Sequence, residues 1–351
     1  YRLPKEVLDN EISYVEELGV EIKTNTPVKN LEDIWNQGYK VVFLATGAGA
    51  SQKMNIPNED IDGVIHALDF LNRINSGKKL SLGQRVAVIG GGNAAVDSAR
   101  VAQRLGAKEV SIVYRRSRTE MPAIETEVDE AEREGVKLHL LAVPVKVLTE
   151  NGQLTGIQCI RMELGEPDAS GRRRPVPIKG SEFDMKVDTV IMAIGQIVDK
   201  TMLPDGLDYT DWGTISVDPV TWQTNIEGVF AGGDVVSGAA DVITAVAAGK
   251  EAAISIDRYL RGIDLTEGRP APLERVKEVN KEGVETKVRH DMPLLKLGKR
   301  QGFAEVELGF DEKTAIEEAK RCLNCAACSE CLECVKVCER RAINHEMEDK
   351  Y

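Results

Sequence analysis

The residues of this chain best suited to chemistry begin with a glycine-rich turn at positions 90–95. An apolar run, 86–89, leads directly into Gly90-Gly91-Gly92-Asn93-Ala94-Ala95, which fits the pattern G-x-G-x-x-A. In such a turn Gly90 permits the bend, Gly92 lets the backbone approach a pyrophosphate, and Ala95 allows close helix–strand packing. N–H groups at the start of the next helix would face the phosphates. The turn predicts a dinucleotide site, with an ordinary strand–turn–helix as the alternative.

Arginines follow the next predicted strand, 109–114, where an NAD site would carry an acid for the ribose hydroxyls. This chain has Arg115 and Arg116 there, with Arg118 just beyond. Guanidinium pairs suit a 2′-phosphate, so the residues favour NADP(H), with NAD(H) as the alternative. The arginines would otherwise be solvated or paired with Glu120 and Glu125. A second arginine run, 172–174, lies in a polar loop and is expected to be solvated, with docking as the alternative.

Three more strand ends carry small residues of the kind that border a flavin. They are Ala45-Thr46-Gly47, Ala193-Ile194-Gly195 and Gly232-Gly233-Asp234. A carboxylate that follows a glycine, such as Asp234, can accept hydrogen bonds from ribityl hydroxyls. The predicted helix after it begins near Ala240, Asp241, Val242 and Thr244, and its N–H groups would stabilise the negative charge of a reduced flavin.

Six of the seven cysteines crowd into one short stretch near the end of the sequence. Cys328, Cys331, Cys334 and Cys338 have the C-x2-C-x2-C-x3-C spacing of bacterial iron–sulfur sites, although Glu339 replaces the usual proline. We expect one [4Fe–4S] cluster, with Cys322 or Cys325 as a further ligand. A second cluster would need thiolates from elsewhere, since two clusters take about eight. The alternative is zinc, which also suits paired C-x2-C units.

Cys159 stands apart from the other cysteines, and its apolar neighbours Ile157 and Ile160 predict a buried structural thiol. Cys159 therefore has no partner at disulfide-reductase spacing. Bound cofactors would do the redox chemistry, so we expect no catalytic side chain in this chain. Hydride would pass from the nicotinamide to the flavin, and single electrons would leave through the cluster.

The elements that must position these residues alternate between helices and apolar strands, which indicates parallel α/β sheets covered on both faces. Strands are predicted at 20–22, 40–45, 85–89, 109–114 and 187–193, with short β segments over 137–194. The charged stretch 122–134 is predicted to be a surface helix. The expected organisation is a partial FAD-binding domain (1–50 and 199–262), an inserted NAD(P)-binding domain (51–198), a linker (263–312) and an iron–sulfur segment (313–351).

These pieces, in this order, resemble the small (beta) subunit of glutamate synthase and its relatives, a broad family of two-dinucleotide flavoproteins. The similar stretches are 1–8, 45–47, 90–95, 114–116, 120–122, 193–195 and 232–234. The resemblance implies a two-dinucleotide-binding-domain α/β fold, and FAD as the flavin. It places FAD near Arg2, Val28, Thr46, Gly233, Asp234 and Val242. It places the nicotinamide dinucleotide near Gly91, Gly92, Asn93, Ala94, Arg115 and Arg116.

Relatives normally hold the ADP half of FAD on an N-terminal G-x-G-x-x-G turn, which this sequence lacks. We expect the first part of the FAD domain to be missing from it, with compromised FAD binding as the alternative. The net charge of −12 argues against nucleic acid as the main partner, because phosphate backbones attract basic surfaces. No apolar run reaches the roughly 20 residues that span a bilayer. Crowded thiols indicate a reducing compartment, and we expect the cytoplasm.

We therefore expect an electron-transferring subunit of a hetero-oligomer, whose partner is a larger catalytic redox subunit or a ferredoxin-type carrier. Two other classes of function stay open at this point. One is a stand-alone flavin-dependent NAD(P)H reductase with a structural zinc site. The other is a non-catalytic assembly module.

Overall fold

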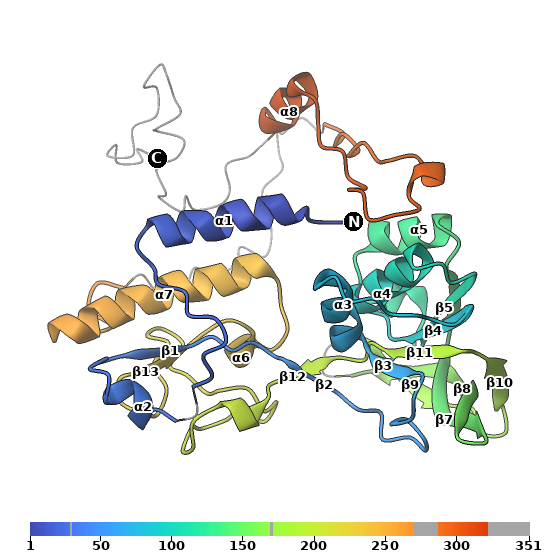
Figure 1. The fold of residues 1–351 in the computed structure, drawn as a ribbon, viewed down its shortest axis with the longest axis horizontal. Coiled ribbons are helices and arrows are strands. Elements are labelled where there is room, and N and C mark those ends of the chain that lie inside the picture. Colours follow the sequence, from blue (N-terminus) through green and yellow to red (C-terminus); the bar gives the residue numbers. More distant parts are fainter. Residues whose placement is uncertain (29, 169–170, 270–286, 322–351) are drawn as a thin grey trace. The chain divides into compact units, whose positions relative to one another are not determined.

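The computed structural model describes residues 1–28, 30–168, 171–269 and 287–321 (Figure 1). The six clustered cysteines lie outside the described residues. The chain divides into two compact units. The first comprises Tyr1, Leu3–Glu274 and Lys296–Ala304, and the second contains Arg2 and the described residues 287–295 and 305–321.

A five-stranded parallel sheet forms the centre of one half of the first unit, with strand order β3-β11-β4-β5-β6. Its strands are β3 (Val64–His66), β11 (Thr189–Met192), β4 (Arg85–Ile89), β5 (Glu109–Tyr114) and β6 (Lys137–Leu140). The central strands β4 and β11 are apolar and buried on both faces, which is the pattern of a covered parallel sheet. The predicted α/β fold class is confirmed.

Alternate residues of β4 point into two different cores. Val86 and Val88 pack against three helices, whose side chains in this core include Phe70, Val96 and Val128. Figure 1 shows these helices grouped beside β4 and β5. They are α3 (Ala67–Asn75), α4 (Asn93–Arg104) and α5 (Glu125–Arg133).

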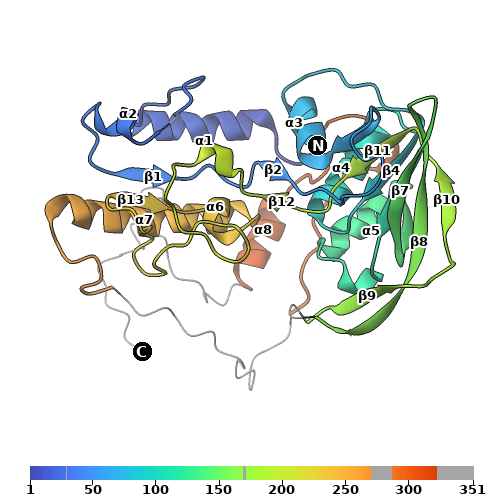
Figure 2. The ribbon, with the colours of Figure 1, turned by 90° about the horizontal axis from the view of Figure 1, so that it is seen from below.

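The opposite face of the parallel sheet packs on an antiparallel sheet. Ala87 and Ile89 of β4 share a core with Ile157 and Cys159. Strands β7, β8 and β10 lie side by side in Figure 2, and β9 pairs with the far end of β8. The four strands are β7 (Ala142–Glu150), β8 (Gln153–Pro167), β9 (Arg173–Pro177) and β10 (Phe183–Lys186).

The other half of the first unit is built on two parallel strands, β1 (Val42–Leu44) and β13 (Val229–Ala231). Two short antiparallel strands, β2 (Ala50–Ser51) and β12 (Gln196–Ile197), pair where the chain enters and leaves the five-stranded half. The α-helices of this half are α1 (Lys5–Glu17), α2 (Glu32–Trp35), α6 (Asp234–Ser237) and α7 (Val242–Arg261). The 3₁₀ helices of the first unit are η1 (Arg118–Glu120), η2 (Lys200–Met202) and η3 (Leu297–Lys299). The strand predicted at 20–22 does not form, because Val20 and Ile22 are exposed with no strand beside them in the described structure.

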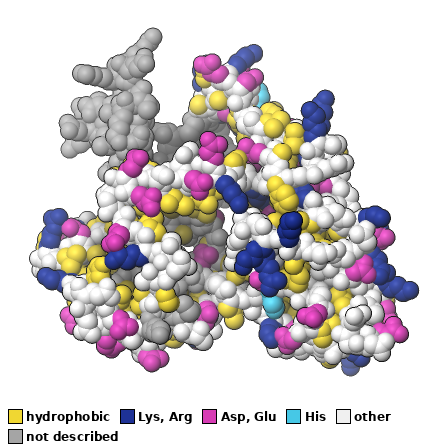
Figure 3. Space-filling model, in the orientation of Figure 1, with side chains coloured by type: hydrophobic (Ala, Val, Ile, Leu, Met, Phe, Trp, Pro, Cys, Tyr) yellow, Lys and Arg dark blue, Asp and Glu magenta, His cyan; other side chains and the backbone are white. Residues whose placement is uncertain are grey.

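Apolar side chains of α1 and α7 are exposed in this half. Helix α1 buries no side chain, although Val7, Leu8, Ile12 and Val15 recur at helical spacing. On α7, Val242 is 81% and Ile243 is 72% exposed. Hydrophobic side chains are visible at the surface around α1 in Figure 3. Exposed apolar surface is typical of regions that contact another molecule or segment.

The second unit contains one described helix, α8 (Glu312–Ala319). Asp311 caps it by accepting a hydrogen bond from the Thr314 N–H (2.7 Å). No described helix is long and apolar enough to cross a membrane.

Candidate functional site

The glycine turn follows β4 directly, as the sequence predicts, and its first glycine is required by the fold. Gly90 has φ +146°, and a Cβ there would lie 2.1 Å from the Ala193 carbonyl oxygen. Its N–H donates to the Val113 carbonyl (3.0 Å), which ties the turn to β5. Glycine is therefore needed at this position for sheet packing as well as for the backbone angle.

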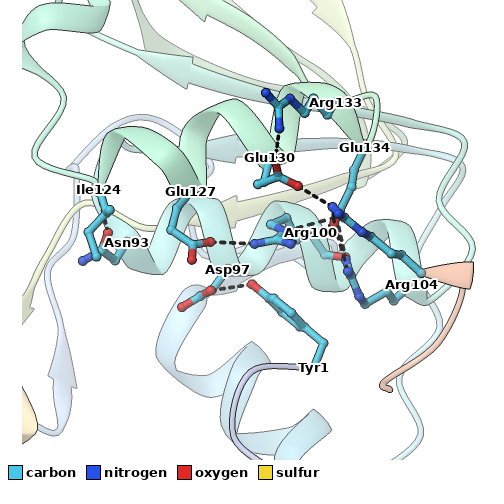
Figure 4. Close-up of polar contacts among 11 residues, drawn as sticks. Tyr1, Asn93, Asp97, Arg100, Arg104, Ile124, Glu127, Glu130, Arg133 and Glu134 are labelled. Carbon is cyan, nitrogen blue, oxygen red and sulfur yellow. Dashed lines mark hydrogen bonds and ion pairs between the residues drawn. The ribbon is translucent and has the colours of Figure 1, made fainter. Parts of the chain in front are cut away.

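The second half of the turn presents the start of a helix. Helix α4 begins at Asn93, and no side chain caps its first turn. The Asn93 side chain accepts the Ile124 N–H (3.0 Å), which joins the turn to the start of α5 (Figure 4). A Cβ on Gly92 would have the Pro122 ring 3.9 Å away as its nearest neighbour. This open approach to the uncapped N–H groups fits a pyrophosphate.

A cleft of about 710 Å³ opens over this turn, a size typical of small-ligand sites. It brings together residues that are far apart in the sequence, including the glycine turn, three arginines and two residues next to α6. The predicted site residues that line it are Gly90, Gly91, Gly92, Asn93, Ala94, Arg115, Arg116, Ala193, Ile194, Gly195, Asp234 and Ala240. Ala95 is fully buried and packs in the helix core, as a small residue at that position should.

The arginines that follow β5 differ in their surroundings. Arg116 is only 4% exposed; its Nε–H donates to the Arg173 carbonyl (2.8 Å) and its other arm pairs with Asp168 (2.5 Å). Arg115 is exposed. Arg118 pairs with Asp129 and with Glu132.

Arg172 also lines the cleft, although the sequence predicted a solvated arginine loop there. Its neighbour Arg173 pairs instead with Glu120 (2.7 Å). A three-arginine run by itself does not reveal which guanidinium faces a ligand. The pairing of β8 with β9, which brings this loop to the end of β5, depends on contacts between distant residues.

The predicted flavin residues Gly233, Asp234 and Asp241 lie on the two-stranded half. Gly233 has φ +72°, where glycine is favoured, and it leads into Asp234 at the start of α6. One Asp234 oxygen accepts the Ala240 N–H (3.3 Å). Asp241 caps α7 by accepting the Thr244 N–H (2.8 Å), so one N–H of that helix start is already satisfied.

Other predicted flavin residues lie outside the cleft among the residues described. They are Ala45, Thr46, Gly47, Gly233, Asp241, Val242 and Thr244, together with the exposed Arg2 and Val28. Their part in binding FAD stays a prediction.

Cys159 is fully buried on β8, within the core shared by the two sheets. Burial, with a smaller contribution from Asp184, raises the pKa of its thiol to about 12. Since the thiolate is the reactive form, Cys159 is inert in the folded protein. Within the described part of the chain it is the one cysteine and has no disulfide partner.

We expect Cys159 to resist iodoacetamide at pH 8 in the folded protein and to react at the rate of an ordinary thiol once the chain is denatured. Peptide mapping by mass spectrometry, with and without guanidinium chloride, measures both. Rapid labelling of the native protein would contradict the assignment of Cys159 as a structural thiol.

A cluster of buried charges lies beside the site on α4 and α5, and we refer to it as the Arg–Glu cluster (Figure 4). Glu134 pairs with Arg100 (2.8 Å), Arg104 (2.8 Å) and Arg300 (3.1 Å). The cluster is completed by Glu127, which pairs with Arg100 (2.6 Å), and Glu130, which pairs with Arg300 (2.5 Å). Arg300 thereby fastens residues 296–304 to the five-stranded half of the same unit.

The Tyr1 ring covers the Arg–Glu cluster. Its centroid lies 4.7 Å from the Arg100 guanidinium and 4.3 Å from that of Arg104, within the range of cation–π attraction. The Tyr1 hydroxyl donates to Asp97 (2.5 Å). Burial alone would raise the pKa of Glu134, but hydrogen bonds from Arg100 and Arg104 outweigh it and hold the pKa at about 2.

No cluster of metal-ligating side chains occurs within the part of the chain that the structure describes. The predicted ligands Cys322, Cys325, Cys328, Cys331, Cys334 and Cys338 lie outside it. The iron–sulfur site stays a prediction from their spacing.

Comparison with known proteins places these observations in a family. Residues 4–249 match the family described as pyridine nucleotide-disulphide oxidoreductase. The chain is 46% identical over 344 residues to the NADP(+)-dependent formate dehydrogenase subunit beta of Moorella thermoacetica, a match that covers 92% of this chain and 48% of that protein. It is 38% identical over 363 residues to the NADPH-Fe(3+) oxidoreductase subunit beta of Geobacter sulfurreducens, covering 92% and 54%.

The resemblance to the glutamate synthase small subunit is confirmed as well. Identity to the glutamate synthase [NADPH] small chain of Escherichia coli is 35% over 288 residues, covering 74% of this chain and 59% of that one. The chain thus spans about half the length of the curated relatives it matches. Among solved structures, Mycobacterium tuberculosis FprA in complex with NADPH has the same fold, with a TM-score of 0.56, 22% identity and 68% of each chain covered.

Proposed function

The chain belongs to the pyridine nucleotide-disulphide oxidoreductase family, and on that premise we propose that it transfers electrons from NADPH, through FAD, to an iron–sulfur cluster and a partner redox subunit. The single observation that carries the proposal is the cleft over the glycine turn. Its walls contain both the uncapped start of α4 and Asp234 with Ala240. A nicotinamide dinucleotide held at the first group would therefore reach a flavin held at the second.

The side chains and backbone of this cleft bind and orient rather than react. Gly92 and the start of α4 would hold the pyrophosphate of NADPH, and the arginines would hold its adenosine end. Asp234 would accept hydrogen bonds from the ribityl chain of FAD. FAD, when bound, supplies the hydride acceptor and passes electrons on singly.

The described residues contain no second glycine-rich turn that could hold the ADP half of FAD. We propose that FAD binds tightly only when the exposed apolar side chains of α1 and α7 are covered by further polypeptide. Val7, Leu8, Val242 and Ile243 belong to this surface. Fully burying an exposed side chain of this kind contributes roughly 1.5–3 kcal/mol, and Val7 and Leu8, which are about half exposed, would contribute less.

The cysteine segment and the relatives together support a role in a larger assembly. Six closely spaced thiols suit a [4Fe–4S] cluster in a reducing compartment such as the cytoplasm. A continuous match over 92% of the chain necessarily includes residues 287–321, which lie beyond the family span 4–249. Relatives that share this extra stretch are named as beta subunits of a formate dehydrogenase and an iron(III) oxidoreductase. We therefore favour a partner of that kind over a glutamate synthase large subunit.

The proposal predicts the cofactor content of the full protein, purified without oxygen together with the subunits that accompany it. We expect stoichiometric FAD, with about four iron atoms and about four sulfides per cluster. NADPH should bleach the flavin absorbance and produce a reduced-cluster signal in electron paramagnetic resonance. Cys331→Ser should lower the iron content and abolish that signal while the flavin stays reducible, whereas Cys159→Ala should leave the iron content unchanged.

Each other outcome identifies a different function. Zinc in place of iron and sulfide would replace the cluster with a structural zinc site and leave a simple flavin reductase. Protein without flavin or iron that also ignores NADPH and NADH would be an assembly module, and the proposal would be wrong.

A further inference from the structure

We propose that residues 120–124, which lead from the end of η1 to the start of α5, fix the orientation of the Gly91–Gly92 peptide and so hold the glycine turn in the form that binds a pyrophosphate. Asn93 and Tyr114 attach this segment to the turn and to β5, which makes them positioning residues. The inference rests on the proposed function, because it explains how the turn is held ready for the pyrophosphate that NADPH and NADH share.

The peptide between Gly91 and Gly92 would rotate readily in an isolated chain, because neither residue has a side chain. In the fold its carbonyl oxygen, that of Gly91, accepts the Ala123 N–H (3.1 Å). The C=O and N–H of a trans peptide point in opposite directions, so the Gly92 N–H points away from Ala123. Gly92 lines the cleft, and no described residue accepts a hydrogen bond from its N–H. The bond from Ala123 therefore keeps this donor ready for a phosphate oxygen.

The 120–124 segment is attached to its surroundings at both ends. At one end the buried Tyr114 hydroxyl donates to the Glu120 carbonyl (2.7 Å). At the other end the Ile124 N–H donates to the Asn93 side-chain oxygen (3.0 Å), as Figure 4 shows. The Tyr114 ring also packs directly against the turn, since a Cβ on Gly91 would lie 2.5 Å from it. These contacts limit the movement of the residues between the two ends.

The residues between those ends are themselves stiff. Met121 has the extended backbone (φ −65°, ψ 124°) that a following proline favours. Pro122 has a restricted φ, and its ring lies 3.9 Å from the position of a Cβ on Gly92. Ala123 is buried and packs in the core beneath the helices. A stiff segment loses little conformational freedom when a ligand binds, so the turn is preorganised for the pyrophosphate.

The test measures steady-state oxidation of NADPH and of NADH by the full protein, with its accompanying subunits and ferricyanide as the electron acceptor. Asn93→Ala should raise the KM for both dinucleotides by the same factor, about 2- to 10-fold, the effect of one lost hydrogen bond. The kcat at saturating NADPH should stay at the wild-type value, because the groups that face the flavin are unchanged. Asn93→Asp should keep the wild-type KM values, since a carboxylate oxygen also accepts the Ile124 N–H.

Tyr114→Phe tests the other end of the segment and decides the matter if Asn93→Ala does not fold. It removes the hydroxyl that holds the Glu120 carbonyl and keeps the ring against the turn, so both KM values should rise within the same range. Thr119→Ala is the matched control, because it removes a hydroxyl from an exposed residue of η1 that is not among the cleft-lining residues. It should change neither KM.

The inference is overturned if Asn93→Ala or Tyr114→Phe leaves both KM values unchanged while the variant melts at the wild-type temperature. It is also overturned if Asn93→Asp raises the KM values as much as Asn93→Ala, because the Asn93 amide would then contact the ligand itself. A changed preference between NADPH and NADH would overturn it too, since the effect would then lie at the adenosine ribose. If instead the wild-type protein oxidises neither NADPH nor NADH, the proposed function itself has failed.

Discussion

Replacing Glu134 with alanine is expected to lower the free energy of unfolding by about 3–5 kcal/mol, the usual result of removing one member of a buried ion-pair network. Glu134 is the one carboxylate that the described structure places against Arg104, whose side chain is 2% exposed. Without it, the Arg104 guanidinium would stay buried beneath the Tyr1 ring with no opposite charge. A loss of this size is about a fifth or more of the stability of a typical domain, which is roughly 5–15 kcal/mol.

Glu132→Ala is the matched control on the same helix. The Glu132 carboxylate pairs with Arg118, but its side chain is 43% exposed, so its removal should cost less than about 1 kcal/mol. Guanidinium chloride unfolding of wild type and both variants, followed by circular dichroism, gives the comparison. Equal losses in the two variants would mean that the Arg–Glu cluster contributes no more than surface ion pairs.

The same network predicts how the contribution of Glu134 to the stability of the fold depends on pH. Its pKa in the folded protein is about 2, below the ordinary value of 4.5. A depressed pKa stabilises the fold above pH 4.5, and this stabilisation is lost as the pH falls from 4.5 towards 2. The stability difference between wild type and Glu134→Ala should therefore be constant at neutral pH and shrink across that acid range. A difference that grows on acidification would contradict the assigned ionisation.

Replacing Gly90 with alanine is expected to prevent correct folding of the five-stranded half, at a cost of about 3 kcal/mol or more. The reason is geometric: the new Cβ would lie 2.1 Å from the Ala193 carbonyl oxygen, on a backbone with φ +146°. Both the turn and β11 would have to move, and each lies in the buried core. Thermal unfolding and the yield of soluble protein measure the effect.

Gly92→Ala provides the contrast within the same turn. Gly92 has an ordinary φ of −93°, and a Cβ there would meet nothing closer than Pro122 at 3.9 Å. The variant should therefore fold with a melting temperature close to that of wild type. Its methyl group would stand where the pyrophosphate approaches, so NADPH affinity should fall by at least about tenfold, or about 1.4 kcal/mol. Normal NADPH binding by a well-folded Gly92→Ala protein would remove the glycine turn from the proposed site.

The local sequence was sufficient to predict the elements that position the cleft. The apolar run before Gly90 and the small residues after it predicted β4, the turn and α4, because a strand buried on both faces and a closely packed helix each require particular residue types. The strands predicted at 85–89 and 109–114 form with those bounds, as β4 and β5. The prediction of a short strand at 20–22 was wrong, since an apolar pair cannot form a strand without a neighbouring strand to hydrogen-bond with.

Partnerships between distant residues could not be predicted in this way. The stretch 122–134 was expected to be a surface helix because it is rich in charge, yet Glu130 and Glu134 are buried against α4 and Arg300. Similarly, nothing in the run 172–174 indicates that Arg172 faces the cleft while Arg173 pairs with Glu120.

The sequence by itself thus determined the residue types, the strand–turn–helix that fits a dinucleotide, and the cysteine spacing that predicts a cluster. Each of these depends on neighbours within a few residues, where backbone geometry and side-chain size act directly. Only the tertiary structure decided that Arg116 pairs with Asp168 and that Arg172 lines the cleft. The electrostatic environment of a charge depends on what surrounds it in space, and at the Arg–Glu cluster those surroundings come from residues as far apart as Tyr1, Glu134 and Arg300.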